Sequence, residues 1–522
     1  MNDDSIEQSV LFPGLFGKRV VAQFDQPHGS SDGGALLLKA CDERLGLTER
    51  LSRCLADDRE PGKIRHTLDD LIRQRVFAIA CGYADCNDAA RLAEDPIHKL
   101  LVGRDPIEGE ALASQPTLSR FENTVGPKAL YRMAQALAQV VIERQRRRLR
   151  GKARRITIEL DPTDDPTHGA QQLSLFNGHY DTWCYLPVAG FIQFDAEPEQ
   201  YLFTYVLRAG NAPAKLGAIG ILARVFERLR QAFPKAGLFV RLDGGFACPE
   251  ILDFLEAQGV DYAVAMAGNA VLDRLCERWM KRARGLSAQS GQTEHVYGEL
   301  RYAAKSWSRK RRIIVKAELV RSPDRAPRDN ARFVITNLPD EPQTLYEDIY
   351  CQRANIELRI KELHHGLEID RTSCTRFWAN QLRVLLTAAA YTLMQELRTC
   401  AAATSCARAQ VSTLREPAQA GRVGYMFGAS HRVAFAAELC VALGLVPCGA
   451  TLGQCVGLTL LLRFQSRGPA PTPVELRLLP ANPHGIRHKI ERFRPFAFCS
   501  TFISLFQRQN HALLHTCSEI HE

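Results

Sequence analysis

Tyr350, Arg353, Glu357 and His364 are spaced so that one helix would carry all four on the same face. Their separations are three, four and seven residues, and side chains three or four positions apart are neighbours along an α-helix. A glutamate with an arginine one turn away suits a metal ion that also holds a phosphate group. The spacing predicts a helix over 342–366 that presents such a site.

Two aspartates far upstream are expected to complete this site, because each stands at the end of a predicted strand. Asp161 closes the segment ITIELD, and Asp243 closes LFVRLDGG. Gly244 and Gly245 follow the second aspartate and permit close approach of the backbone or a substrate. Carboxylates hold Mg²⁺, and phosphoryl transfer between nucleic-acid strands uses two such ions. These residue types predict metal ligands at Asp161, Asp243 and Glu357.

Each of these residues also has an ordinary structural explanation. Aspartates at strand ends are common in turns, and a glutamate four positions after an arginine commonly forms a surface ion pair. Asp164, Asp165 and His168 are interpreted as a polar turn fixed by prolines, rather than as supports of a metal site. An apolar stripe argues that the helix is packed against the protein, and its members are Ile349, Ile356, Ile360, Leu363 and Leu367.

The composition is that of a globular chain with a basic balance. Its 522 residues are 46% hydrophobic and carry a net charge of +9, which favours a polyanionic partner and two or more domains. The 16 cysteines include no C-x-x-C pair, so buried thiols in a reducing compartment are expected. No signal-peptide pattern begins the chain. The uncharged segment Leu439–Leu462 is long enough for a membrane span, but its proline and glycines favour a chain without one.

Residues 1–150 are predicted to form a helical N-terminal region that binds DNA. Apolar residues recur at helical spacing in LDDLIRQRVFAIACGY and KALYRMAQALAQVVIERQ. Between them, Ser114 is the expected N-cap of a helix whose polar face includes Arg120. This segment is similar to the recognition helix of a helix-turn-helix, and an ordinary amphipathic surface helix fits it equally well. A basic run from Arg144 to Arg155 then marks the boundary near 150 and is suited to guide a phosphate backbone.

From residue 156 onwards, strands alternate with helices. ITIELD, WCYLPVAGFIQFD and YLFTYVLRAG predict an antiparallel meander, and LFVRLD and YAVAMAG follow with helices between them. We therefore expect an α/β catalytic domain of residues 151–290 and 340–416, with a β-rich insertion at 291–339. In the insertion, Trp307 lies among five basic residues. Its indole either stacks on an unpaired base or packs within an ordinary basic hairpin.

These motifs carry a resemblance to a known family. YCQRANIELRIKELHHGLEIDRTSC resembles the Y-(2)-R-(3)-E-(6)-K signature of one branch of insertion-sequence DDE transposases. LDPTDDPTHG, NGHYDTWCYLPVAGF, VRLDGGFACPE and QLRVLLTAAAYTLMQELR resemble the same branch, most closely the insertion-sequence family numbered thirteen-eighty. The similarity runs from about residue 10 to 416, with the motifs in the same order.

The resemblance implies a fold and an activity. The fold would be a ribonuclease-H-like mixed sheet, in which Asp161, Asp243 and Glu357 form a catalytic triad. The cofactor would be two Mg²⁺ ions, with Mn²⁺ as a substitute. Tyr350 and Arg353 match the signature positions beside the glutamate, whereas His364 replaces the final lysine. A neutral imidazole supplies no fixed positive charge, so its contact with DNA is the weakest of the set.

The implied activity is metal-dependent cleavage at the ends of a mobile element and strand transfer into target DNA. The partners would be terminal inverted repeats and target DNA in the bacterial cytoplasm, bound by a dimer. Two alternatives stay open: a DNA nuclease that does not join strands, and a DNA-binding protein that has lost catalysis.

Residues 417–522 differ in character from the rest of the chain. No aspartate follows Asp370, and the last 106 residues contain one lysine, Lys489, but six of the 14 histidines. The similarity to transposases stops within QVSTLRE. The hypothesis is that this tail is read in a shifted frame, and the alternative is a small C-terminal domain.

Overall fold

The computed structural model describes residues 30–323, 325–402 and 404–420, together with six short strands. Those strands are β1 (Val10–Phe12), β2 (Val20–Val21), β14 (Tyr425–Met426), β15 (His431–Ala434), β16 (Thr459–Phe464) and β17 (Glu475–Leu479). Most of the tail predicted at 417–522, and all but the last residues of Leu439–Leu462, lie outside the described residues. Among the residues described, no helix is both long and apolar enough to cross a membrane.

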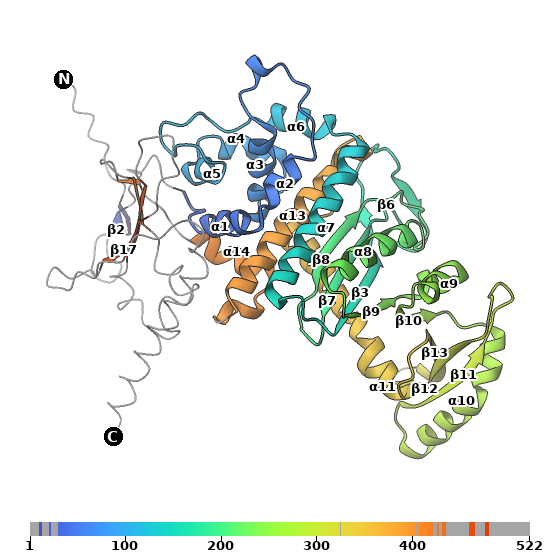
Figure 1. Ribbon diagram of the computed structural model, residues 1–522. Helices are drawn as coiled ribbons and strands as arrows, with labels where there is room; N and C mark the ends of the chain where they lie inside the picture. Colours follow the sequence, from blue (N-terminus) through green and yellow to red (C-terminus); the bar gives the residue numbers. More distant parts are fainter. Residues whose placement is uncertain are drawn as a thin grey trace, which may run out of the picture.

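The predicted N-terminal helical region is present. Its helices are α1 (Ala35–Leu45), α2 (Leu47–Ser52), α3 (Leu68–Ala80), α4 (Ala89–Leu92), α5 (Pro96–Leu101), α6 (Gln115–Thr124) and α7 (Pro127–Leu149). The segment predicted to begin after Ser114 is α6, with a proline in its first turn. Helices α1–α6 gather on one side of α13 (Phe377–Cys400), whereas α7 runs beside α13 along the sheet (Figure 1).

A mixed eight-stranded sheet forms the centre, in the order β11-β12-β13-β10-β9-β3-β7-β8. Only β3 with β9 and β9 with β10 pair in parallel. The predicted meander is present as the antiparallel neighbours β3, β7 and β8. The strands are β3 (Arg155–Pro162), β7 (Val188–Phe194), β8 (Tyr201–Val206), β9 (Gly237–Leu242), β10 (Asp261–Met266), β11 (Glu294–Tyr302), β12 (Arg311–Ser322) and β13 (Arg325–Thr336).

The segment predicted as a β-rich insertion, 291–339, extends this sheet and does not form a sheet of its own. Its strand β13 pairs antiparallel with β10, and β12 and β11 follow outward. A small second sheet, in the order β4-β6-β5, lies in the connection between β3 and β7. Its strands are β4 (Asp165–Pro166), β5 (Leu175–Asn177) and β6 (Thr182–Tyr185).

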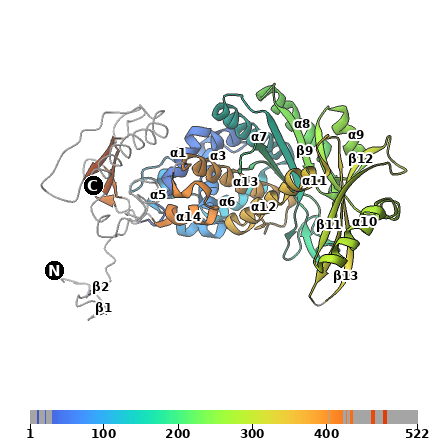
Figure 2. The same cartoon turned by 90° about the horizontal axis from the view of Figure 1, so that it is seen from below.

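Helices cover both faces of the sheet (Figures 1 and 2). One face packs against α7, α8 (Ala218–Ala232), α9 (Pro249–Ala257) and α10 (Ala270–Ser290) in a core that includes Ile158 and Leu160. The opposite face packs against α12 (Ala354–Leu367) and α13 (Phe377–Cys400). A last helix, α14 (Val411–Ala420), contacts α12 and α13.

The N-terminal helices and the sheet share one hydrophobic core through α13. This helix is buried along almost its whole length, as expected for a sequence such as VLLTAAAYTLM, which is apolar on all sides. One cluster joins residues of α1, α3 and α7 to α13 and to the sheet residues Phe191 and Tyr205. The predicted boundary near 150 is therefore a change of secondary structure, while the packing is continuous across it.

Buried ion pairs fix the helices around α13. Glu122 of α6, 1% exposed, accepts hydrogen bonds from Arg75 Nε at 3.0 Å and Arg383 Nε at 2.8 Å. Burial opposes ionisation of Glu122, but the two guanidinium groups outweigh it and hold its pKa below the usual range. The carboxylate thus links α3, α6 and α13.

Glu122→Ala is expected to lower the free energy of unfolding by roughly 3–5 kcal/mol, because it leaves two buried arginines without their counter-ion. Urea unfolding of the full chain measures this loss. The control is Glu43→Ala, which removes an exposed carboxylate 3.7 Å from Lys39 and is expected to cost less than about 0.5 kcal/mol. Equal losses in the two variants would show that the buried pairs do not hold the helices together.

Candidate active site

The register of the two central strands brings Asp161 and Asp243 together. Along β3, Ile156, Ile158 and Leu160 enter the core beneath α8 and α9, so Asp161 points to the opposite face, as the alternation predicts. Leu160 pairs with Leu242 at the end of the parallel strand β9. Asp161 and Asp243 are the next residues of their strands, and they emerge side by side at one sheet edge.

A tight glycine turn follows Asp243. The Asp243 side chain caps this turn, because Oδ1 accepts a hydrogen bond from the Gly245 amide at 2.9 Å. A Cβ atom at Gly245 would stand 2.7 Å from the Cβ of Ala214, which is too close for any other residue without movement. Gly245 thus allows the Ala214 side chain to approach closely, while the close approach of a substrate stays a prediction.

The segment 342–367 is helical, but it is not one regular helix. After α11 (Pro342–Thr344), a π-helical turn, η5, spans Leu345–Tyr350, and a 3₁₀ turn, η6, spans Cys351–Arg353. The prediction that one regular 3.6-residue helix carries Tyr350 and Arg353 together with Glu357 is therefore wrong, because Tyr350 ends the π-helical turn and Arg353 ends the 3₁₀ turn. Glu357 and His364 both lie on the regular helix α12. Irregular turns of this type are frequent at functional sites.

The predicted apolar stripe packs α12 against the core. Ile356, Ile360, Leu363 and Leu367 are all buried. A second anchor lies at the π-helical turn, where Arg241 Nη1 donates to the carbonyl oxygen of Ile349 at 2.6 Å. The same guanidinium forms a buried ion pair with Glu159 of β3, also at 2.6 Å.

Arg353 lies at the centre of the three predicted carboxylates. Its Nη2 is 2.5 Å from Asp161 Oδ1 and 3.7 Å from Asp243 Oδ2. Its Nη1 is 3.5 Å from Glu357 Oε1. The structure therefore brings together all three predicted ligands and the predicted arginine, with the guanidinium as the shared counter-ion.

Burial and like charges destabilise the anionic form of Asp161. Together these effects raise the pKa of Asp161 to about 7: burial is the largest cause, the guanidinium of Arg353 opposes it, and the negative charges of Asp243 and Glu357 add to it. A cation bound beside Asp161 would favour its anionic form. The donor set consists of carboxylates alone, which suits a hard ion such as Mg²⁺ or Mn²⁺ better than a soft one.

Tyr350 and His364 flank the carboxylates in different ways. Tyr350 packs on Tyr346 with ring centroids 5.8 Å apart, and burial raises the pKa of its phenol to about 12, so the hydroxyl can act as a hydrogen-bond donor. His364 is held between two partners, Asp370 Oδ2 at 3.1 Å from Nδ1 and Thr163 Oγ1 at 3.4 Å from Nε2. Its imidazole thus links α12 to the end of β3.

The other predicted DNA contacts lie away from this centre. Arg120 is exposed on α6 and lines a groove of about 1470 Å³ with Arg59, Lys63 and Arg132. Trp307 is half-buried between Tyr302, at 5.6 Å between ring centroids, and the guanidinium of Arg311, at 5.2 Å. This placement corresponds to the packed-indole interpretation of Trp307.

The polar residues after Asp161 are mostly structural. Asp165 is fully buried and accepts hydrogen bonds from the Thr372 hydroxyl at 2.9 and 3.1 Å, whereas His168 is exposed. Trp183 and Phe176, on the small sheet beyond these residues, are 58% and 49% exposed. The sequence analysis missed these exposed aromatics, although the run HYDTWCY places aromatic residues among polar ones.

Comparison with known proteins identifies one family. The family described as "Transposase DDE domain group 1" matches residues 12–417 of this chain. The match covers α1–α13 and the complete eight-stranded sheet. No curated protein matches the chain.

Arg353→Gln is expected to destabilise the protein by roughly 1.5–3 kcal/mol in EDTA, because the carboxylates lose their charged hydrogen-bond partner. Adding Mn²⁺ is expected to restore most of this stability, since a divalent ion supplies the missing positive charge. Thermal unfolding in both buffers measures the effect. Arg371→Gln is the control, because the Arg371 side chain is 56% exposed and its ion pair with Asp85 is as long as 3.5 Å. A loss that Mn²⁺ does not reverse would contradict the counter-ion role.

Asp165→Asn is expected to flatten the dependence of stability on pH. Burial raises the pKa of Asp165 well above its ordinary value, although the hydrogen bond from Thr372 lowers it. The folded protein therefore keeps a proton that the unfolded chain releases above about pH 4, so this residue makes stability fall as the pH rises, by up to roughly 1.4 kcal/mol per pH unit. Urea unfolding of both proteins between about pH 5 and pH 8 compares the slopes. Identical slopes would mean that Asp165 is ionised in the folded state.

Proposed function

The chain belongs to the transposase DDE domain family, group 1, and on that premise we propose that it cuts DNA at the ends of a mobile element and joins the released ends to target DNA. The observation that carries this proposal is the convergence of Asp161, Asp243 and Glu357 on the guanidinium of Arg353. The motifs support the finer part of the proposal, that the chain is of the branch with the Y-(2)-R-(3)-E-(6)-K signature, in the family numbered thirteen-eighty.

The three carboxylates are the proposed ligands of two Mg²⁺ ions, for which Mn²⁺ can substitute. When bound, such ions activate the attacking oxygen and stabilise the leaving oxygen of the phosphodiester. In this structure the ligand atoms of the three carboxylates do not all lie within 4.8 Å of one another, which is too far apart for a single ion. Among the described residues, a different group of side chains meets that condition. Departure of Arg353 from their midst would let the carboxylates draw together.

Arg353 is then released to bind DNA. After it has moved away from the three carboxylates, the guanidinium can form two hydrogen bonds to the nearby scissile phosphate. The protonated hydroxyl of Tyr350 can donate a further bond to the DNA backbone. His364, held by Asp370 and Thr163, reaches phosphate only if one of these contacts opens.

The strand order supports the proposed ribonuclease-H-like fold. Within the sheet, β3, β7 and β8 are consecutive antiparallel neighbours, and β9 and β10 then add in parallel on the other side of β3. The acidic residues lie on the first strand and directly after the first parallel one. In this arrangement β11–β13 are an addition at the outer edge.

Terminal inverted repeats are the proposed ligands of the N-terminal helices, with Arg120 in the groove as one contact. The basic run at the C-terminal end of α7 divides into two sets. Arg144 and Arg148 are paired with Glu396 and Glu197, whereas Arg146, Arg147 and Arg150 are exposed around a hollow of about 630 Å³. The exposed set is available for DNA phosphates.

Two element ends must be held together for strand transfer, so a dimer on DNA in the bacterial cytoplasm is part of the proposal.

Two aromatic side chains are candidates for stacking on an unpaired base. Stacking by Trp307 requires the indole to leave Tyr302 and Arg311. Trp183 is 58% exposed and needs no such movement.

The tail is proposed to be a shifted reading frame from about residue 417. The family match ends at residue 417, where the composition also changes. The coding DNA decides this point. Another frame that encodes an arginine-rich helical continuation would support the shift, and its absence would favour a genuine C-terminal domain.

Replacing any one triad residue, by Asp161→Asn, Asp243→Asn or Glu357→Gln, is expected to slow DNA cleavage by roughly 100-fold or more, because the metal ligands are removed. The assay uses Mg²⁺ and a duplex that carries the inverted repeat flanking the gene, and it scores nicked and joined products separately. Asp164→Asn, on the adjacent turn, is the control and is expected to stay within about threefold of wild type.

The same assay separates the alternatives. Nicking by wild type without joined product would favour a nuclease. Binding without cleavage, unchanged by Asp243→Asn, would favour a DNA-binding protein that has lost catalysis.

A further inference from the structure

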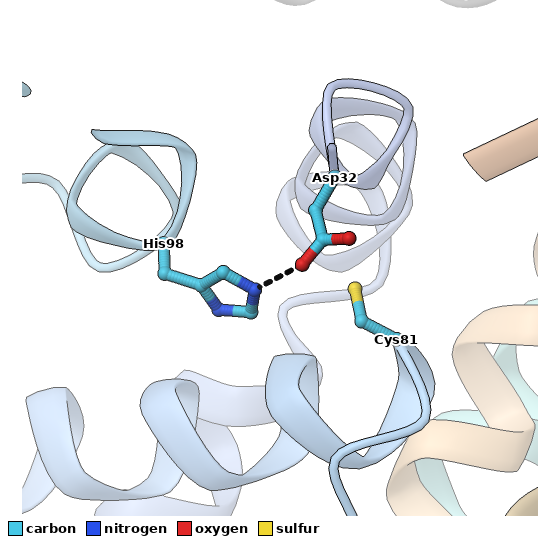
Figure 3. A group of neighbouring side chains, drawn as sticks. All are labelled: Asp32, Cys81 and His98. Carbon is cyan, nitrogen blue, oxygen red and sulfur yellow. Dashed lines mark hydrogen bonds and ion pairs between the residues drawn. The ribbon is translucent and has the colours of Figure 1, made fainter. Parts of the chain in front are cut away.

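A second group of side chains that can bind a metal ion lies among the N-terminal helices. Its residue types and its position in the fold differ from those of the three carboxylates. Asp32 is in the turn before α1, Cys81 ends α3, and His98 is on α5. Each is 1% exposed. Figure 3 shows the three side chains pointing toward one another from three separate elements.

The ligand atoms of this group are close enough to share one ion. The carboxylate oxygen, the thiol sulfur and the imidazole nitrogen all lie within 4.8 Å of one another, and His98 Nε2 is 2.9 Å from Asp32 Oδ2. Among the described residues, this is the one group of at least three such side chains that meets this condition. Sulfur, nitrogen and oxygen ligands together suit Zn²⁺, which binds cysteine, histidine and aspartate at about 2.0–2.3 Å in a tetrahedron.

We propose that Asp32, Cys81 and His98 bind one Zn²⁺ ion, which fastens α1, α3 and α5 to one another. The ion would leave a fourth position to a water molecule. A divalent cation with one thiolate, one carboxylate and a neutral imidazole has no net charge, so the assembled centre is compatible with full burial.

Neighbouring groups hold the ligands in place. The Asp32 amide donates to Ser30 Oγ at 3.1 Å, and the His98 amide donates to Asp95 Oδ1 at 2.9 Å. The ring of Tyr83 packs edge-on against His98 with centroids 5.7 Å apart. Supports of this type fix the orientation of metal ligands.

A positively charged side chain lies next to Cys81. The guanidinium of Arg415 lies against Gly82, with Nη1 3.1 Å from the position of an added Cβ. Binding of Zn²⁺ would release the thiol proton to solvent and form the sulfur–metal bond.

The test measures metal bound by the purified full chain. After incubation with Zn²⁺ and gel filtration, elemental analysis is expected to find about one Zn²⁺ per chain. Co²⁺ is the optical probe, because a thiolate ligand gives cobalt a charge-transfer band in the near ultraviolet that carboxylates do not give. Titration of the cobalt protein with Zn²⁺ should remove that band.

Variants assign the site. Cys81→Ser and His98→Ala are expected to abolish the cobalt band and weaken Zn²⁺ binding by roughly 100-fold or more, whereas Cys41→Ser, a buried cysteine of α1 outside the group, should leave both unchanged. Asp243→Asn should also leave the band intact, because the proposed Mg²⁺ site has oxygen ligands only. Failure of the zinc site and failure of the transposase proposal are thereby distinguished.

Two results would overturn the proposal. One is a wild-type protein that retains no Zn²⁺ and gives no cobalt band, which would leave Asp32 and His98 as a buried ion pair beside a thiol. The other is a band that survives Cys81→Ser. The wild-type measurement stands even if a variant fails to fold.

Discussion

Mutual repulsion among three carboxylates at one sheet edge is the constraint on which the site depends. Two of them, Asp161 and Asp243, are placed side by side by the parallel register of β3 and β9. The third, Glu357, arrives on α12. Such a set is stable only with a cation in its midst, and in this structure Arg353 supplies it through contacts of 2.5, 3.7 and 3.5 Å. The arginine thus holds the three carboxylates together, and in the proposed reaction metal and DNA would replace it.

The rest of the fold holds α12 in register with the sheet. Arg241 connects Glu159 of β3 to the π-helical turn before α12. At the other end, Glu362 of α12 accepts hydrogen bonds from the Tyr391 hydroxyl and the Val411 amide, each at 2.8 Å, and pairs with Arg398. These contacts join α12 to α13 and α14. Because α13 also packs against the N-terminal helices, the proposed DNA-binding region and the site share one continuous core.

The sequence predicted which residues converge at this sheet edge better than it predicted their local geometry. Strand alternation is a strong signal, so Asp161 and Asp243 were placed at the same sheet edge, and the apolar stripe correctly predicted that α12 is packed. The irregular turns before α12 leave no signature in residue spacing, and one contact to them comes from Arg241 on a distant strand. This is why Tyr350 and Arg353 were assigned to one regular helix.

Longer-range features were harder to predict. The burial of α13 between two layers shows that the N-terminal helices share a core with the sheet, which periodicity alone cannot show. The scattered cysteines gave no metal-binding spacing, yet Cys81 meets Asp32 and His98 through tertiary packing. The exposure of Trp183 and the packing of Trp307 likewise depend on neighbours far away in sequence. The mixed α/β class was therefore accessible from the sequence, and the contacts between elements far apart along the chain were not.

The most direct measurement is anomalous X-ray scattering from crystals of the protein bound to an element-end duplex and Mn²⁺. Manganese peaks are expected between Asp161, Asp243 and Glu357, with the guanidinium of Arg353 moved onto a DNA phosphate. Arg353 still bound to Asp161, with no manganese among the three carboxylates, would contradict it.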